Sequence, residues 1–206
     1  MLRSILLVAI VACLGCKQQI VEHRDIDAGT NDVAEIYGAF LDEWTGKEKD
    51  PINVSIVAKA PSAEEIKQFS ECAADTRWME AKSINDIAIF VGRLPYVRLV
   101  DSDKWSPQDP SVLIAEGQSV ESAIEAGFAH GLLTLSAISF DESHTTAAFT
   151  YSFVCGALCG SGGPAIFKAT PDGWVQSDKQ CGGWVSYLQR SRPGNSFEPT
   201  PFRGLA

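Results

Sequence analysis

The feature that most constrains this chain is a strictly alternating stretch that leads into a segment rich in cysteine and glycine. Between Thr145 and Val154, one set of alternate positions holds Ala147, Phe149, Tyr151 and Phe153, and the other holds Thr146, Ala148, Thr150 and Ser152. A period of two is typical of a β-strand. Continuing the alternation puts Cys155 on the aromatic face, at the start of Cys155-Gly-Ala-Leu-Cys159-Gly-Ser-Gly-Gly163.

The spacing of Cys155 and Cys159 predicts that the chain reverses between them. In an extended strand their Cα atoms would lie about 13 Å apart. A disulfide requires a Cα separation of about 4.4–6.8 Å. Gly156 and Gly160 allow a sharp bend at low steric cost. We therefore expect a structural disulfide that closes a loop between two strands.

The other internal cysteines are Cys72 and Cys181. Four cysteines allow three pairings, and sequence alone does not choose among them. We favour Cys155–Cys159 together with Cys72–Cys181. The second bridge would close a loop of about 109 positions, for which the loop-entropy model gives a stabilisation of about 4.7 kcal/mol.

Two functional alternatives use Cys155 and Cys159 as reactive groups. A thiol oxidoreductase usually has Cys-x-x-Cys at a helix N-terminus, whereas here three residues intervene and Gly160-Ser-Gly-Gly-Pro164 follows. A copper carrier would use the soft thiolates with a histidine, and the chain has only His23, His130 and His144. Neither pattern is complete, so we expect no catalytic residue, metal or cofactor.

The N-terminus has the pattern of an export signal. Arg3 precedes an apolar run from Ile5 to Gly15, which is too short to span a bilayer as a helix and is typical of a secretory signal peptide. Leu14-Gly15-Cys16 resembles the bacterial lipobox, which implies a diacylated Cys16 as the first mature residue. Three residues before its cysteine the lipobox prefers an aliphatic residue, and this chain has Cys13 at that position. Ile10-Val11-Ala12-Cys13 is a second possible box, and plain secretion is the alternative to both.

Export and charge together define the expected partners. Lys17 stands where inner-membrane lipoproteins carry aspartate, so the resemblance implies an outer-membrane lipoprotein that faces the periplasm, with its acyl chains (palmitate among them) in the membrane. The formal net charge is −9, from 17 basic and 26 acidic residues. This charge argues against nucleic-acid binding, which requires lysine and arginine to replace phosphate counterions. The oxidising compartment favours disulfides.

The first half of the chain is expected to be mainly helical. Residues 16–29 form a polar tether, and Val33, Ile36, Tyr37, Phe40, Leu41 and Trp44 mark an amphipathic helix. A capping box at Ser62 and Glu65 opens a second helix to about Ala73, and a third follows Ser119. Short strands are expected at Ile52–Ile56, Ile87–Val91 and Tyr96–Val100. Residues 101–110 read as a loop.

From Leu132 onward the sequence predicts strands and turns. The expected strands are Leu132–Phe140, Thr145–Val154, Ala165–Ala169, Trp174–Ser177 and Trp184–Leu188, with a turn at Pro171-Asp172-Gly173. Strands with short links favour an antiparallel meander. Helices upstream of it make the class α+β, in an NTF2-like or cystatin-like arrangement. We expect a signal peptide at 1–15, one domain at 30–189 and a disordered tail at 190–206.

Several residues in this second half resemble a C-terminal segment of exported bacterial proteins and lipoproteins. The resemblance rests on the Cys155-Gly-x-Leu-Cys159-Gly-x-Gly motif, with Leu135-Ser136, Ile138-Ser139-Phe140, Gly173-Trp174 and Trp184-Val185-Ser186 around it. It covers about a quarter of the chain, from Leu132 to Ser186. That group has no assigned activity, so the resemblance implies an architecture and no chemistry. We expect a lipid-anchored binding or structural module whose protein or small-molecule partner the sequence does not identify.

Overall fold

The structure is a computed structural model that describes residues 16–74, 76–157, 159–179 and 181–186, with side chains from residue 29 onward. The chain is an α+β protein, as expected. Its helices are α1 (Cys16–Thr45), α2 (Ala63–Cys72), α3 (Ala88–Val91), α4 (Pro110–Ala115) and α5 (Val120–Ala129). Its strands are β1 (Ile52–Ser55), β2 (Val97–Val100), β3 (Leu132–Leu135), β4 (Ser139–Phe140), β5 (Thr146–Gly156), β6 (Cys159–Thr170), β7 (Gly173–Gln176) and β8 (Trp184–Ser186).

All the strands belong to one mixed sheet. Its main order is β2-β1-β3-β5-β6-β7, with β4 paired to β5 and β8 paired to β6. From β3 onward the neighbouring strands are antiparallel. Strand β1, however, runs parallel to both β2 and β3. A parallel pair requires a crossover connection, and the segments that hold α2 to α5 provide it, so the sheet is not a purely antiparallel meander.

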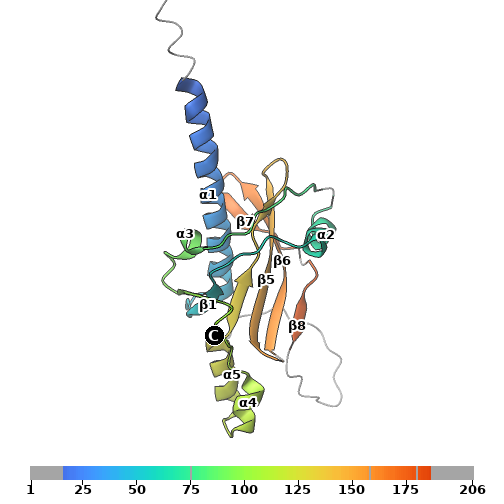
Figure 1. The fold of residues 1–206 in the computed structure, drawn as a ribbon. Helices are drawn as coiled ribbons and strands as arrows, with labels where there is room; N and C mark the ends of the chain where they lie inside the picture. Colours follow the sequence, from blue (N-terminus) through green and yellow to red (C-terminus); the bar gives the residue numbers. More distant parts are fainter. Residues whose placement is uncertain (1–15, 75, 158, 180, 187–206) are drawn as a thin grey trace, which may run out of the picture.

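The long helix α1 covers one face of the sheet and runs in the same direction as β5 (Figure 1). Near the end of α1, Trp44 packs against Phe153, with ring centroids 5.6 Å apart. Asp32 lies about 18 Å nearer the start of the helix, and its carboxylate is 2.8 Å from His144, just before β5 begins. Between these contacts the stripe predicted for α1 meets the aromatic face predicted for β5, and both periodicities are confirmed.

Helix α2 lies on the opposite face of the sheet (Figure 1). Its capping box is present, because Ser62 accepts from the Glu65 N–H and Glu65 accepts from the Ser62 N–H at 2.7 Å. The helix buries Phe69 and Cys72 against Ala148 and Ile166, residues of β5 and β6. The second face of β5 is therefore also covered, which explains why Ala148 is as buried as the aromatic residues on the first face.

Two predicted strands differ from the structure. Ile87–Val91 contains the single-turn helix α3, because the Asp86 carboxylate accepts from the Ala88 N–H at 2.9 Å and starts a helical turn. Leu132–Phe140 is divided into β3 and β4, because the Ala137 N–H donates to the Lys59 carbonyl at 2.7 Å. Both interruptions come from hydrogen bonds with residues outside the alternating pattern.

The tether expected at residues 16–29 is wrong, because these residues form the first turns of α1. The expected signal peptide, the tail at 190–206 and residues 187–188 of the last predicted strand lie outside the described residues. Within the described part of the chain, no helix combines the length and apolar character needed to cross a membrane.

Candidate functional site

The cysteine and glycine segment forms the tip of the β5–β6 hairpin. Cys155 and Cys159 are joined by a disulfide with a Cα separation of 5.0 Å. Cys155 is fully buried in the core that α1 covers, on the aromatic side of β5 as the alternation predicts. The strand pairing shifts register between Val154 and Gly156, and Gly156 adopts a φ of 152° that disfavours any other residue type.

Asp109 joins this tip to helix α4. One carboxylate oxygen caps α4 by accepting from the Ser111 N–H at 2.9 Å and the Ser111 hydroxyl at 2.7 Å. The other oxygen accepts from the Ala157 N–H, inside the disulfide loop, at 2.7 Å. One side chain therefore fixes the start of a helix to a loop that lies 48 positions further along the chain.

The same junction is closed by Pro110 and two glycines. A Cβ on Gly127 of α5 would lie 2.5 Å from Pro110 Cγ and 3.3 Å from the Cys155 carbonyl oxygen. A Cβ on Gly156 would lie 2.8 Å from Pro110 Cδ. Helices α4 and α5 form a hairpin that projects beyond the end of the sheet (Figure 1). This junction holds the α4–α5 hairpin against the disulfide loop.

The Gly127→Ala substitution is expected to destabilise the protein even though alanine is the better helix former. Helix propensity alone would favour alanine by about 1 kcal/mol, whereas a core overpacked by one methyl group typically loses 1–3 kcal/mol. Gly38→Ala is the matched control, because Gly38 lies in α1 and an added Cβ would meet nothing within 4 Å. Urea denaturation should show a loss for Gly127→Ala and no loss for Gly38→Ala. Equal effects would contradict a close-packed junction.

Asp109 should also make stability depend on pH. The Ala157 N–H, together with the Ser111 hydroxyl and N–H, lowers the pKa of Asp109 below its ordinary value. A lowered folded-state pKa contributes stability above the unfolded-state pKa that is lost as the pH falls through the folded-state value. Asp109→Ala should therefore cost about 2 kcal/mol near pH 7, through the lost helix cap and charged hydrogen bonds.

The measurement is urea denaturation of the wild type and Asp109→Ala between neutral and strongly acidic pH. The difference between the two proteins should shrink on acidification. Asp50→Asn is the control, because Asp50 is exposed and outside the junction. A cost that stays constant with pH would show that the charge of Asp109 is unimportant.

The α4–α5 hairpin exposes a row of large apolar side chains. Of the ten large apolar side chains that are exposed in the described part of the chain, four lie here: Val112 (52%), Val120 (44%), Ile124 (42%) and Phe128 (41%). The last three are spaced by four residues and so follow one side of α5. The inward side of α5 carries Ala123 and Gly127, both buried. We call Val120, Ile124 and Phe128 the α5 stripe.

Acidic residues accompany the α5 stripe. Between Pro110 and His130 the sequence has three glutamates, Glu116, Glu121 and Glu125, and no lysine or arginine. Glu121 and Glu125 are exposed and four residues apart, so they form a second row along α5 beside the stripe. The hairpin thus combines an exposed apolar row with a negative border.

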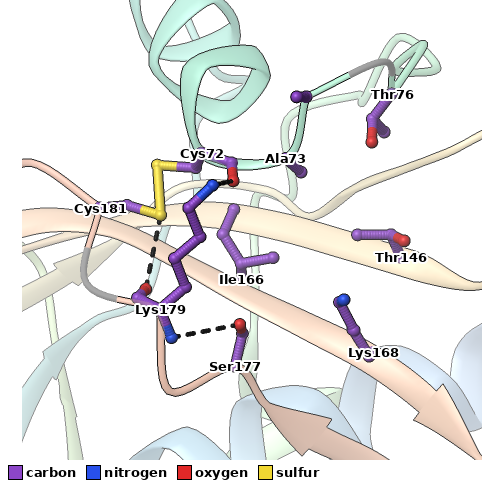
Figure 2. Close-up of a pocket in the computed structure, with 10 residues that line it drawn as sticks. Cys72, Ala73, Thr76, Thr146, Ile166, Lys168, Ser177, Lys179 and Cys181 are labelled. Atoms are coloured by element: carbon purple, nitrogen blue, oxygen red, sulfur yellow. Dashed lines mark hydrogen bonds between the residues drawn. A yellow bond between two sulfur atoms is a disulfide. The ribbon is translucent and has the colours of Figure 1, made fainter.

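The second disulfide joins Cys72, at the end of α2, to Cys181, with a Cα separation of 5.3 Å. The structure therefore has both pairs that the sequence analysis favours. A pocket of about 250 Å³ lies against this bridge, and a second of about 170 Å³ also has the two cysteines in its wall. Figure 2 shows the larger pocket, with Ile166 and Lys168 of β6 opposite the bridge.

Four residues that line the larger pocket contact one another: Cys72, Ser177, Lys179 and Cys181. The Lys179 ammonium donates to the Cys72 carbonyl at 2.6 Å (Figure 2), which neutralises the negative end of α2. Ser177 accepts from the Lys179 N–H at 3.3 Å. These contacts fasten the segment after β7 to α2. The pocket is smaller than most small-molecule sites, and we interpret it as part of this structural connection.

The environment of Cys155 and Cys159 does not favour thiol chemistry. Reactive cysteines are usually accessible and near positive charge. Here Cys155 is buried, and the loop donates a hydrogen bond to a negative group, the Asp109 carboxylate. His144 pairs with Asp32 and His130 stacks on Trp105. In the described ranges no three His, Cys, Asp or Glu side chains are grouped so as to hold a metal ion.

Two elements of the site were not predicted from sequence. The prolines of residues 101–110 favour a loop, whereas the structure begins α4 at Pro110 and makes Asp109 its N-cap. The signal was present in Asp109-Pro110-Ser111, since aspartate is a preferred N-cap and proline is favoured at the first helical position. Cys16 is the first residue of α1, and its side chain lies outside the described part.

Comparison of the chain with protein-family models, curated proteins and solved structures found no match.

Proposed function

We propose that this chain is a non-catalytic binding module of the bacterial cell envelope, anchored by a lipid on Cys16 and stabilised by its two disulfides. The α4–α5 hairpin is its binding surface. The observation that carries this proposal is the α5 stripe, because apolar rows bordered by polar residues usually mark interaction sites. The disulfide loop, Asp109 and Pro110 support it by fixing the hairpin to the sheet.

The geometry of α1 fits an anchored protein. The sixteen positions from Cys16 to Asp32 would span about 24 Å as a helix, and the first turns of α1 project beyond the end of the sheet opposite to α4 and α5 (Figure 1). A lipid on Cys16 would hold the domain to the membrane, and the α5 stripe would face away from it. In this proposal α1 and the antiparallel strands from β3 onward form the rigid platform.

The anchor is tested by replacing Cys16 with alanine. We expect the wild-type chain to sediment with membranes and to incorporate radiolabelled palmitate, and Cys16→Ala to lose both properties. Intact mass spectrometry under non-reducing conditions should report cleavage before Cys16 and two internal disulfides. Cys13→Ala is the control, since it alters the neighbouring cysteine only. Loss of labelling in Cys13→Ala instead would move the anchor to that residue.

The same mass spectrometry tests the redox and copper alternatives. A structural disulfide at Cys155 and Cys159 should resist alkylation after mild reduction, because Cys155 is buried. A thiol at either position that is alkylated rapidly, or that binds Cu(I) in a stoichiometric amount, would replace the binding module with one of those alternatives.

A further inference from the structure

We propose that the α5 stripe binds a protein segment whose apolar side chains are bordered by lysine or arginine. This inference rests on the proposed function and specifies the chemistry of the partner. It follows from three properties of one surface: the apolar row along α5, the glutamates beside it, and the rigid support beneath it.

The apolar row provides the contact area. Val120, Ile124 and Phe128 project from successive turns of α5 and are each more than two-fifths exposed. They cover about 12 Å along the helix axis, the length of two turns of a partner helix. Helices that bind in this way insert side chains spaced by three and four residues.

The glutamates determine the sign of the partner's charge. Glu121 and Glu125 border the stripe, and Glu116 lies in the turn between α4 and α5. No lysine or arginine occurs from Pro110 to His130 to neutralise them. Lysine or arginine beside the partner's apolar row would pair with these carboxylates and would speed association and fix the register.

The same charges disfavour two other occupants. A second copy of this chain would bring three glutamates against three glutamates, and like charges across an interface are unfavourable. An anionic bilayer would repel the glutamates, since such surfaces attract lysine and arginine. A basic, apolar protein segment meets both requirements of the surface.

The support beneath α5 reduces the cost of binding. Phe128 stacks on Phe153 with centroids 5.7 Å apart, and Phe153 packs on Trp44 of α1. Gly127 closes against Pro110 and the Cys155 carbonyl. The stripe is therefore held in place before the partner arrives, and less conformational entropy is lost on association.

The test uses the full chain and two synthetic amphipathic peptides of about 18 residues, long enough to form helices. One combines leucine with lysine and the other combines leucine with glutamate. Fluorescence anisotropy should show that the lysine peptide binds the wild type roughly tenfold more tightly than the glutamate peptide. Added salt should reduce this difference.

Two double variants separate the charge from the apolar row. Glu121→Lys/Glu125→Lys should reverse the preference between the peptides, whereas Ile124→Ser/Phe128→Ser should abolish the binding of both. Glu64→Lys/Glu71→Lys on α2 is the matched control, because both residues are exposed and lie on the other face of the sheet. Circular dichroism and the melting temperature should confirm that all three variants are folded.

The outcomes distinguish this inference from the proposed function. If the serine variant loses binding but charge reversal leaves the preference unchanged, the surface is a binding site and the proposed partner chemistry is wrong. If the serine variant binds both peptides normally, the surface itself is not a binding site. Dimerisation, or binding to vesicles of equal parts phosphatidylcholine and phosphatidylglycerol, that is lost with Ile124→Ser/Phe128→Ser would also overturn the inference.

Discussion

Replacement of Cys72 and Cys181 together by alanine is expected to lower the free energy of unfolding by about 4.7 kcal/mol. The bridge joins residues 109 positions apart, and cross-links that close such long loops restrict the unfolded chain most. In the folded state it also fastens the segment after β7 to the end of α2. Because most domains have only about 5–15 kcal/mol of stability, the variant should unfold at a much lower guanidinium concentration.

The control for this prediction is the double replacement of Cys155 and Cys159. That bridge spans only four positions, and the same loop-entropy model gives a contribution of about 2 kcal/mol. Guanidinium denaturation of the wild type and both variants, without reductant, measures the difference. If loss of the short bridge costs as much as loss of the long one, strain or core packing at Cys155 outweighs chain entropy.

The Phe149→Ala substitution is expected to cost about 3–5 kcal/mol, the usual range when a phenylalanine is removed from a packed core. Phe149 is fully buried in β5. Its ring centroid lies 5.4 Å from that of Tyr37 and 5.1 Å from that of Phe40, both in α1, and 6.0 Å from that of Phe167 in β6. Removal of the ring leaves a cavity where the helix and two strands meet.

The matched control is Phe128→Ala, the same chemical change at a side chain that is 41% exposed. This substitution should cost roughly 1 kcal/mol, because part of its surface already contacts water. Thermal or urea denaturation of the two variants gives the comparison. A similar loss at both positions would mean that α1 does not pack on β5 as tightly as described.

Local pattern accounts for the elements that were predicted correctly. The alternation from Thr145 to Val154 needs only the period of a strand, and the capping box at Ser62 and Glu65 involves residues three positions apart. Where a distant partner intervenes, local pattern fails. The Lys59 carbonyl interrupts the strand expected at Leu132–Phe140, although nothing near Ala137 in the sequence indicates it.

The candidate site was predictable to a smaller extent. Cys155 and Cys159 were recognisable because their spacing and glycines require a reversal, and the favoured pairing leaves Cys72 with Cys181. The exposure of the α5 stripe was not predictable, since Val120, Ile124 and Phe128 have the spacing of a core-facing helix. Which side of α5 is buried depends on Gly127, whose missing side chain lets Pro110 and Cys155 approach.

The amino-acid sequence by itself therefore determined the α+β class, the central strand, the main amphipathic helices and the short cysteine loop, because each depends on residues close together in the chain. Tertiary structure decided the parallel pairing of β1, the helix at α3 in place of a strand, and the role of Asp109. It also decided which side of α5 meets water. These features depend on contacts between residues far apart in sequence, where many pairings satisfy the same local pattern and only packing and hydrogen bonding select one.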